Sequence, residues 1–133
     1  MLKDLEWMVF QSSWLTLEKF QKMADTQTIF LVAYHAGKAV GFKLGYIKKG
    51  ENALFSWLGG VHPDYRRQGI AQGLLEEQEK AARELNLDSV YFTSYDRFPA
   101  MIALGEKNGY QRIRSEMDGG ELKYWYEKRL NEQ

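Results

Sequence analysis

Cysteine is absent from the 133-residue chain, and histidine occurs only twice, at His35 and His62. Without a thiol the chain has no disulfide framework, no cysteine nucleophile and no cysteine-ligated zinc. Two histidines are too few for a histidine-rich metal site, so we expect no metal cofactor. A chain of this length buries roughly two thirds of the surface that its unfolded form exposes, so its core needs neither disulfides nor a metal.

Net charge is also absent, since 18 Lys and Arg residues balance 18 Asp and Glu residues. Nucleic-acid-binding domains usually carry a basic excess, so we expect no nucleic-acid partner. No apolar run approaches the ~20 residues of a membrane span, and residues 1–7 contain no secretory apolar stretch. Scarce proline and 14% aromatic residues argue against disorder. We therefore expect a single soluble, cytoplasmic domain over residues 1–133, with no membrane partner.

The hydrophobic period of the first half of the chain changes at about Thr28. Residues 1–25 have helical spacing, with Leu17, Phe20 and Ala24 on one face. Beyond Thr28 the composition becomes β-branched and aromatic, and short turn sequences divide it into strands. We expect an antiparallel meander of three strands, at residues 29–34, 39–47 and 53–61.

The clearest predicted helix opens the second half of the chain and ends near Asn86. It runs from 70 to 85, with an apolar face made of Ile70, Leu74, Ala81 and Leu85. A predicted strand follows at 89–95, and a strand–helix–strand unit of this size is normally a right-handed parallel crossover. A short helix and two last strands complete the pattern, at residues 99–107, 110–114 and 121–128.

These elements predict a mixed α/β domain with antiparallel front strands, a central parallel pair and about four flanking helices. Gly59 and Gly60 interrupt the third strand. Paired glycines inside a strand predict a bulge or a close backbone approach by another group. A bulge there would splay the parallel strands, 53–61 and 89–95, and leave unpaired N–H and C=O groups for a ligand.

The turn that joins the third strand to the 70–85 helix has the features of an anion site. No Ser, Thr, Asp or Asn stands at the helix cap near Gly69, so the first backbone N–H groups lack a side-chain cap. Arg66 and Arg67 add positive charge beside a helix end that already carries about half a charge. The small residues Gly69, Ala71 and Gly73 permit close approach, although they also suit helix packing. The pattern predicts a cradle for phosphate or pyrophosphate.

Two short motifs support this interpretation. Arg66-x-x-Gly69-x-Ala71, preceded by Val61-x-Pro63-x-Tyr65, resembles the acetyl-CoA signature of the GNAT family of N-acetyltransferases. Glu106-Lys107-x-Gly109-Tyr110 resembles the second motif of that family. The resemblance extends over roughly residues 28–128, which is nearly the whole predicted order of strands and helices.

The resemblance implies that acetyl-CoA is the co-substrate. Its pyrophosphate would bind backbone N–H groups of the cradle, and its pantetheine arm would lie in a V-shaped gap between the 53–61 and 89–95 strands. A backbone N–H near Val61 would stabilise the oxyanion that forms when the acceptor amine attacks the thioester. The implied cofactor-binding residues are Val61, Arg66, Arg67, Gln68, Gly69, Ile70, Ala71, Gln72 and Gly73.

The catalytic residues of the family do not carry over to this chain. Gly105 stands where the family commonly has a Tyr that protonates the leaving thiolate, and Phe98 stands at the position of the usual Asn. Tyr95, Tyr91 and Ser94 are alternative acids, or water protonates a thiolate whose pKa is near 8.5. The third strand has no carboxylate to act as base, so the nominal bases are Glu51, His62, Asp64 and Glu116, or ordered water. We assign no catalytic residue.

The leading hypothesis is direct acetyl transfer from acetyl-CoA to a primary amine of a small molecule or peptide, by a monomer or homodimer. The alternative is a non-catalytic module of the same fold that binds acyl-CoA, and Gly105 motivates it. A third hypothesis is an interaction domain that binds no nucleotide. The family's usual first strand has no convincing counterpart at residues 1–7, and Trp14 is a candidate to line the acceptor pocket.

Overall fold

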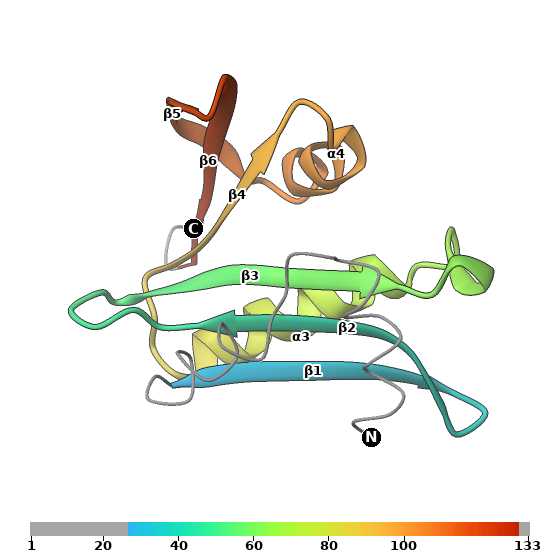
Figure 1. The fold of residues 1–133 in the computed structure, drawn as a ribbon. Helices are drawn as coiled ribbons and strands as arrows, with labels where there is room; N and C mark the ends of the chain where they lie inside the picture. Colours follow the sequence, from blue (N-terminus) through green and yellow to red (C-terminus); the bar gives the residue numbers. More distant parts are fainter. Residues whose placement is uncertain (1–26, 131–133) are drawn as a thin grey trace.

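The computed structural model describes residues 27–130. Three expectations fall outside the described residues: the helices of residues 1–25, the lack of the family's first strand at residues 1–7, and the place of Trp14 in an acceptor pocket. Within them the chain forms six strands, two α-helices and one 3₁₀ turn, drawn in Figure 1. Their bounds are β1 Thr28–His35, β2 Lys38–Tyr46, β3 Ala53–Val61, η1 Pro63–Tyr65, α3 Ile70–Glu84, β4 Ser89–Tyr95, α4 Pro99–Lys107, β5 Gln111–Asp118 and β6 Glu121–Arg129.

All six strands belong to one sheet, in the order β1-β2-β3-β4-β6-β5. The β1–β2 and β2–β3 pairs are antiparallel, which confirms the predicted meander. The β3–β4 pair is parallel and is joined by α3, which confirms the predicted central pair. The mixed α/β class is therefore as expected. The described part holds two of the roughly four α-helices that we predicted.

The central parallel pair is short and then opens. Register pairs join β3 to β4 only from Ala53↔Ser89 to Phe55↔Tyr91. Beyond Phe55 the two strands diverge, and Figure 1 shows β4 turning away from β3 toward the β6–β5 hairpin. The V-shaped gap predicted between these strands is present, and it lies at the centre of the sheet.

The bulge in β3 is not where we predicted it. Gly59 and Gly60 pair regularly with β2. The register shift falls earlier, between the pairs Leu44↔Leu58 and Gly45↔Ser56, so that Trp57 is the extra residue. The glycines are therefore explained by close packing: a Cβ built on Gly60 would lie 3.3 Å from the ring of Phe42.

Helix α3 packs against one face of β1, β2 and β3 (Figure 1). Glycines of β2 permit the close approach, because a Cβ on Gly41 would lie 2.9 Å from Ile70, and one on Gly45 would lie 3.1 Å from Gln78. The predicted apolar stripe is wrong in part. Leu85 is 40% exposed, and the buried residues of α3 are Leu74, Leu75, Gln78, Glu79 and Ala82.

The main core joins α3 to the second half of the sheet. Its largest buried side chains are Phe92 and Tyr126, whose rings stack 5.2 Å apart across β4 and β6. On the last strand Tyr124 and Tyr126 are buried, whereas Leu122 is exposed. In residues 27–130 no helix combines the length and apolarity that crossing a membrane requires.

Candidate functional site

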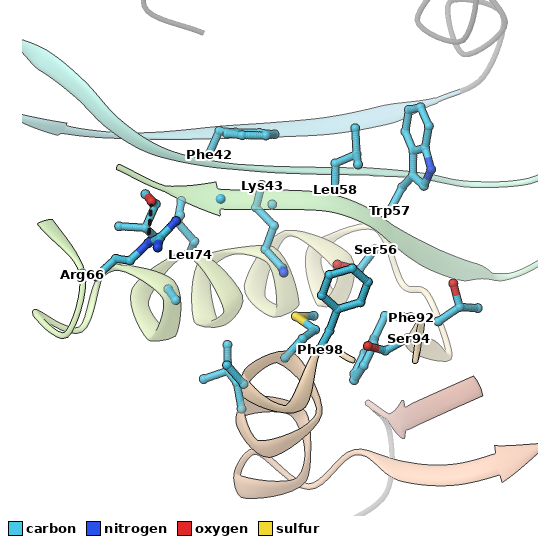
Figure 2. A pocket seen from close by; sticks show the side chains of 18 residues that line it. Phe42, Lys43, Ser56, Trp57, Leu58, Arg66, Leu74, Phe92, Ser94 and Phe98 are labelled. Atoms are coloured by element: carbon cyan, nitrogen blue, oxygen red, sulfur yellow. Dashed lines mark hydrogen bonds between the residues drawn. The ribbon is translucent and has the colours of Figure 1, made fainter. Parts of the chain in front are cut away.

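A cavity of about 590 Å³ occupies the gap between β3 and β4 (Figure 2). Its walls come from β2, β3, β4, the loop before α3, the first turns of α3, and α4. The amide of His62 donates to the carbonyl of Val40 at 2.7 Å. Because strand backbone groups alternate in direction, those of Gly59 and Val61 face the opposite edge, where β4 has diverged. Among the described residues, the cavity is thus bordered by a strand edge that β4 leaves unpaired.

The N-terminus of α3 opens at the mouth of this cavity. Gly69 is the cap residue, with a φ of 81°, and no side chain of the described residues caps the first turn. Arg67 also has a positive φ, of 64°, which turns the chain sharply into the helix. A Cβ built on either Gly69 or Gly73 would meet no atom of residues 27–130 within 4 Å. The glycines therefore keep the space in front of the helix N–H groups clear, as an anion site requires.

The two arginines of the cradle differ in role. Arg66 lines the cavity, and its Nε donates to the carbonyl of Val61 at 3.2 Å, which closes the end of β3 (Figure 2). Arg67 is exposed beside the helix N-terminus. Both arginines place positive charge near the cradle. The guanidinium of Arg66 is already hydrogen-bonded to the backbone of Val61, whereas Arg67 is exposed.

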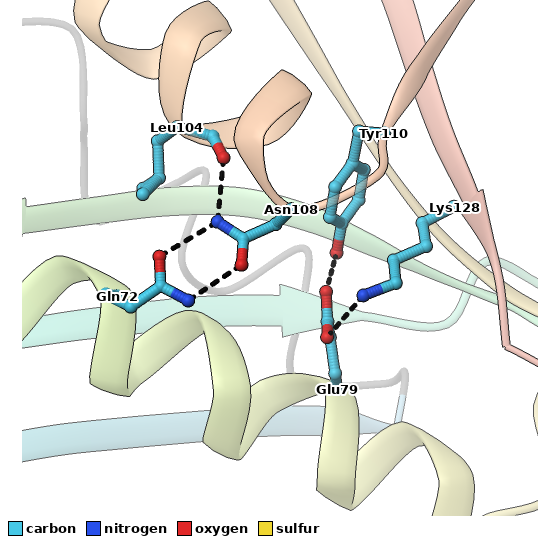
Figure 3. Close-up of polar contacts among 6 residues, drawn as sticks. All are labelled: Gln72, Glu79, Leu104, Asn108, Tyr110 and Lys128. Carbon is cyan, nitrogen blue, oxygen red and sulfur yellow. Dashed lines mark hydrogen bonds and ion pairs between the residues drawn. The ribbon is translucent and has the colours of Figure 1, made fainter.

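The nine predicted cofactor-binding residues divide into three groups. Val61, Arg66 and Ala71 line the cavity. Gln72 instead faces α4: its side-chain amide donates to Asn108 at 2.7 Å and accepts from it at 2.9 Å (Figure 3). That pair fixes the first turn of α3 to the end of α4. The remaining five surround the helix N-terminus outside the cavity lining, and these are Arg67, Gln68, Gly69, Ile70 and Gly73.

Of the alternative acids, only Ser94 lines the cavity, where it is buried. The Tyr91 phenol donates to Glu51 at 2.8 Å, and burial together with this carboxylate raises the pKa of the phenol. The Tyr95 phenol donates to Asp118 at 2.8 Å, and this hydrogen bond raises the pKa of Tyr95. Both phenols are held by carboxylates away from the cavity.

The nominal bases also lie outside the cavity lining. The ring Nδ1 of His62 accepts from the backbone amide of Asp64 at 3.1 Å. Glu116 pairs with Arg114 at 3.4 Å on the edge strand β5. Glu51 accepts from Tyr91, as described above. Within residues 27–130 no Asp or Glu lines the cavity.

Gly105, at the position of the family's Tyr, faces the core rather than the cavity. A Cβ built on it would lie 2.5 and 2.7 Å from ring atoms of Phe92. Phe92 is held in place because its ring stacks on Tyr126 and also meets the Tyr110 ring at a tilted angle. A side chain at this position therefore requires the Phe92 ring to shift.

Lys43 is a cavity residue that sequence reasoning missed. It lies on β2 between Gly41 and Gly45, it is only 6% exposed, and it lines the cavity. Burial lowers the pKa of its ammonium to about 8, while the charge of Glu79 opposes that shift. A Lys flanked at two-residue spacing by glycines under a helix is the signal that could have identified it.

Glu79 holds a buried polar network beneath the cavity (Figure 3). It is 5% exposed, accepts from the Tyr110 phenol at 2.9 Å, and pairs with Lys128 at 3.0 Å. Burial, followed by the effect of Glu79, raises the pKa of Tyr110. Glu79 of α3 is thus tied to Tyr110 and to Lys128 of β6 by contacts between distant segments.

A splayed parallel pair over a cavity, opening beside an uncapped helix N-terminus, defines an α/β domain suited to an extended anionic ligand with amide groups. Comparison with known proteins agrees. The profile of the acetyltransferase (GNAT) family matches residues 1–110, and the chain belongs to this family.

Two curated relatives are acetyltransferases. The one from Sodalis glossinidius is 32% identical over 91 residues, which make up 68% of this chain and 63% of that protein. The one from Pectobacterium atrosepticum is 30% identical over 93 residues, 70% of this chain and 64% of that protein. The matched region thus spans just under two thirds of the length of these relatives.

Solved structures show the same fold at low identity. The ribosomal-protein-S18-alanine N-acetyltransferase of Escherichia coli has a TM-score of 0.77 at 18% identity, and the match covers 90% of this chain and 79% of that one. The PaiA N-acetyltransferase of Thermoplasma acidophilum, solved with coenzyme A, has a TM-score of 0.69 at 20% identity, covering 84% and 67%.

Proposed function

We propose that the chain is an acetyl-CoA-dependent N-acetyltransferase that transfers the acetyl group directly to a primary amine, without a covalent enzyme intermediate. The observation that carries this proposal is the cavity between β3 and β4, which opens at the bare N-terminus of α3. Family membership and a structural neighbour that was solved with coenzyme A support it.

The parts of the cofactor match the parts of the site. The diphosphate suits the N–H groups at the α3 N-terminus, beside Arg67 and in front of the open space at Gly69 and Gly73. The pantetheine arm carries amides, which suit the edge of β3 that β4 leaves unpaired at Gly59 and at the Val61 N–H, since the Val61 carbonyl accepts from Arg66. The thioester would then lie deep in the cavity, where backbone N–H groups of the same edge can stabilise the oxyanion.

The acceptor would be an amine on a small molecule or peptide. Phe42, Trp57 and Phe98 line the cavity with aromatic surface (Figure 2). Because no carboxylate lines it within residues 27–130, a polycationic acceptor would find no counter-charge there. These features favour an amine with a single charge beside apolar groups.

The test is a calorimetric titration with acetyl-CoA, followed by a thiol-release assay over a panel of amines that includes peptides with free N-termini. We expect saturable binding, and faster thiol release with at least one amine. Absence of acetyl-CoA binding would refute the proposal.

A second candidate function is a non-catalytic acyl-CoA-binding module. Two observations favour it: Gly105, where a side chain would clash with Phe92, and the lack of a carboxylate in the described cavity lining. Tight acetyl-CoA binding, with no amine accelerating thiol release, would support this module over the enzyme.

A further inference from the structure

Only one cavity-lining side chain in the described part of the chain can exchange a proton near neutral pH. The ionisable residues among the lining are Lys43 and Arg66. Arg66 stands at the mouth with its Nε on the carbonyl of Val61, and a guanidinium does not release its proton in proteins. Lys43 is therefore the one acid–base group that residues 27–130 bring to the cavity.

The path of the Lys43 side chain depends on the glycine opposite it. Lys43 and Gly59 are cross-strand partners on β2 and β3. A Cβ built on Gly59 would lie 3.7 Å from both Cγ and Nζ of Lys43, so the side chain runs directly across Gly59. Figure 2 shows its Nζ reaching past β3 into the cavity. The glycine thus lets a residue of β2 reach the gap on the far side of β3.

Burial brings the Lys43 ammonium close to giving up a proton, and the nearby charge of Glu79 partly opposes this effect. Helix α3 contributes Glu79, whose charge acts on Lys43 and is shared with Lys128 of β6. Arg66 is the other cation at the cavity, and β3 and β4 contribute the hydroxyls of Ser56, Thr93 and Ser94. No hydrogen bond to Nζ forms within residues 27–130. With a pKa of about 8, Lys43 is mostly protonated at pH 7 but close to its titration point.

We propose that Lys43 is the catalytic residue that donates a proton to the sulfur of coenzyme A as that sulfur leaves. This inference rests on the proposed function. Lys43, which lines the cavity from β2, would thus supply the acid that the family's Tyr supplies and that Gly105 cannot. An acid whose pKa is close to that of the thiol, near 8.5, transfers its proton efficiently.

The proposed step balances. The acceptor nitrogen forms its bond to the thioester carbon, and the tetrahedral intermediate expels sulfur with the electron pair of the C–S bond. Sulfur takes a proton from Nζ, which becomes a neutral amine. The new amide nitrogen loses a proton to water, and Lys43 regains one from water. The products are the acetylated amine and coenzyme A with its thiol protonated.

The test follows the thiol of bound coenzyme A, so it needs no acceptor. Free coenzyme A and its complexes with the wild type, Lys43→Met and Lys43→Arg are titrated with base while the ultraviolet absorbance of the thiolate is recorded. We expect the wild-type complex to lower the thiol pKa by about one unit or more, as a nearby cation does. Lys43→Met should abolish the shift, and Lys43→Arg, which keeps the charge, should retain it.

Each outcome separates this inference from the proposed function. Binding of coenzyme A is measured first by calorimetry, and a lack of binding by the wild type refutes both. If Lys43→Met binds coenzyme A and lowers its thiol pKa as the wild type does, the role of Lys43 is refuted, and the proposed function stands. Intact-mass measurement after incubation with acetyl-CoA should show an unmodified chain, and a stable acetyl group on Lys43 would also overturn the role as acid.

Turnover provides a second readout once an amine acceptor is known. The wild-type rate should fall above about pH 8, where Lys43 loses its proton. In Lys43→Arg the rate should not fall above pH 8, and kcat should be lower by roughly 10²–10⁴-fold, because a guanidinium does not give up a proton. A wild-type kcat in Lys43→Arg would contradict the proposed proton transfer.

Discussion

Two glycines lie inside helices, Gly73 in α3 and Gly105 in α4, and replacing each by alanine should change stability in opposite directions. In a helix interior alanine is more favourable than glycine by about 0.5–1 kcal/mol. A Cβ on Gly73 meets nothing within 4 Å, so Gly73→Ala should gain that amount. The melting temperature should rise by roughly 2–5 °C.

The same substitution at Gly105 adds a clash. Its Cβ would lie 2.5 Å from the ring of Phe92, which is only 2% exposed and stacks on Tyr126. Overpacking of this kind costs about 1–3 kcal/mol. After the helix-propensity gain, the net loss for Gly105→Ala should be on the order of 1–2 kcal/mol.

Urea unfolding followed by circular dichroism measures both variants under one condition. We expect the midpoint to rise for Gly73→Ala and to fall for Gly105→Ala, with unchanged slopes. Acetyl-CoA affinity should fall for Gly73→Ala despite its greater stability, because the methyl group enters the proposed diphosphate site. A Gly105→Ala variant as stable as the wild type would refute the packing argument.

Three further predictions concern single side chains. Gln78 is fully buried and its amide has no hydrogen-bond partner among residues 27–130, so Gln78→Met should raise the free energy of unfolding by about 1–3 kcal/mol in urea titrations. The pKa of Lys43 is about 8 when folded and 10.5 unfolded, so its burial destabilises the fold below pH 8 and that penalty fades as pH rises to 10.5. Lys43→Met should therefore gain roughly 3 kcal/mol at pH 7, and the gain should shrink toward pH 10.5 in unfolding measured across that range. Tyr95→Phe should leave thiol release unchanged, because the Tyr95 phenol donates to Asp118 away from the cavity, and a large loss of rate would contradict this placement.

Most of the fold could be predicted from local patterns. The strand at 89–95 and the helix at 99–107 have the predicted bounds. Alternation and turn residues determine such elements within a few neighbouring positions. The splayed gap was implied by the family resemblance, whereas the bulge predicted at the paired glycines lies at Trp57 instead. A bulge depends on how two strands pair, which no single strand reveals.

The buried polar residues were not predictable in the same way. From the sequence, Glu79 looks like part of the solvent-facing side of its helix. Its partners, Tyr110 and Lys128, lie 31 and 49 residues away along the chain. Lys43 reads as a surface residue of a strand. Its burial follows from α3 packing over the glycines on either side, a contact between distant segments. Sequence reasoning therefore located the proposed cofactor cradle but not the acid–base group beside it.

The proposed diphosphate site can be tested with two glycines that differ mainly in location. Gly69 and Gly50 have φ values of 81° and 86°, and a Cβ on either meets nothing within 4 Å. Valine at either position introduces similar backbone strain, but only Gly69 caps α3 at the cavity mouth. Gly50 lies in the loop between β2 and β3, so Gly50→Val is the matched control.

Calorimetric titration of acetyl-CoA into the wild type, Gly69→Val and Gly50→Val is thus the most direct measurement. We expect saturable binding by the wild type and by Gly50→Val, and the loss of most of the affinity in Gly69→Val, since the branched side chain would occupy the space before the helix N–H groups. Equal affinity in all three proteins would contradict the placement of the diphosphate at the start of α3.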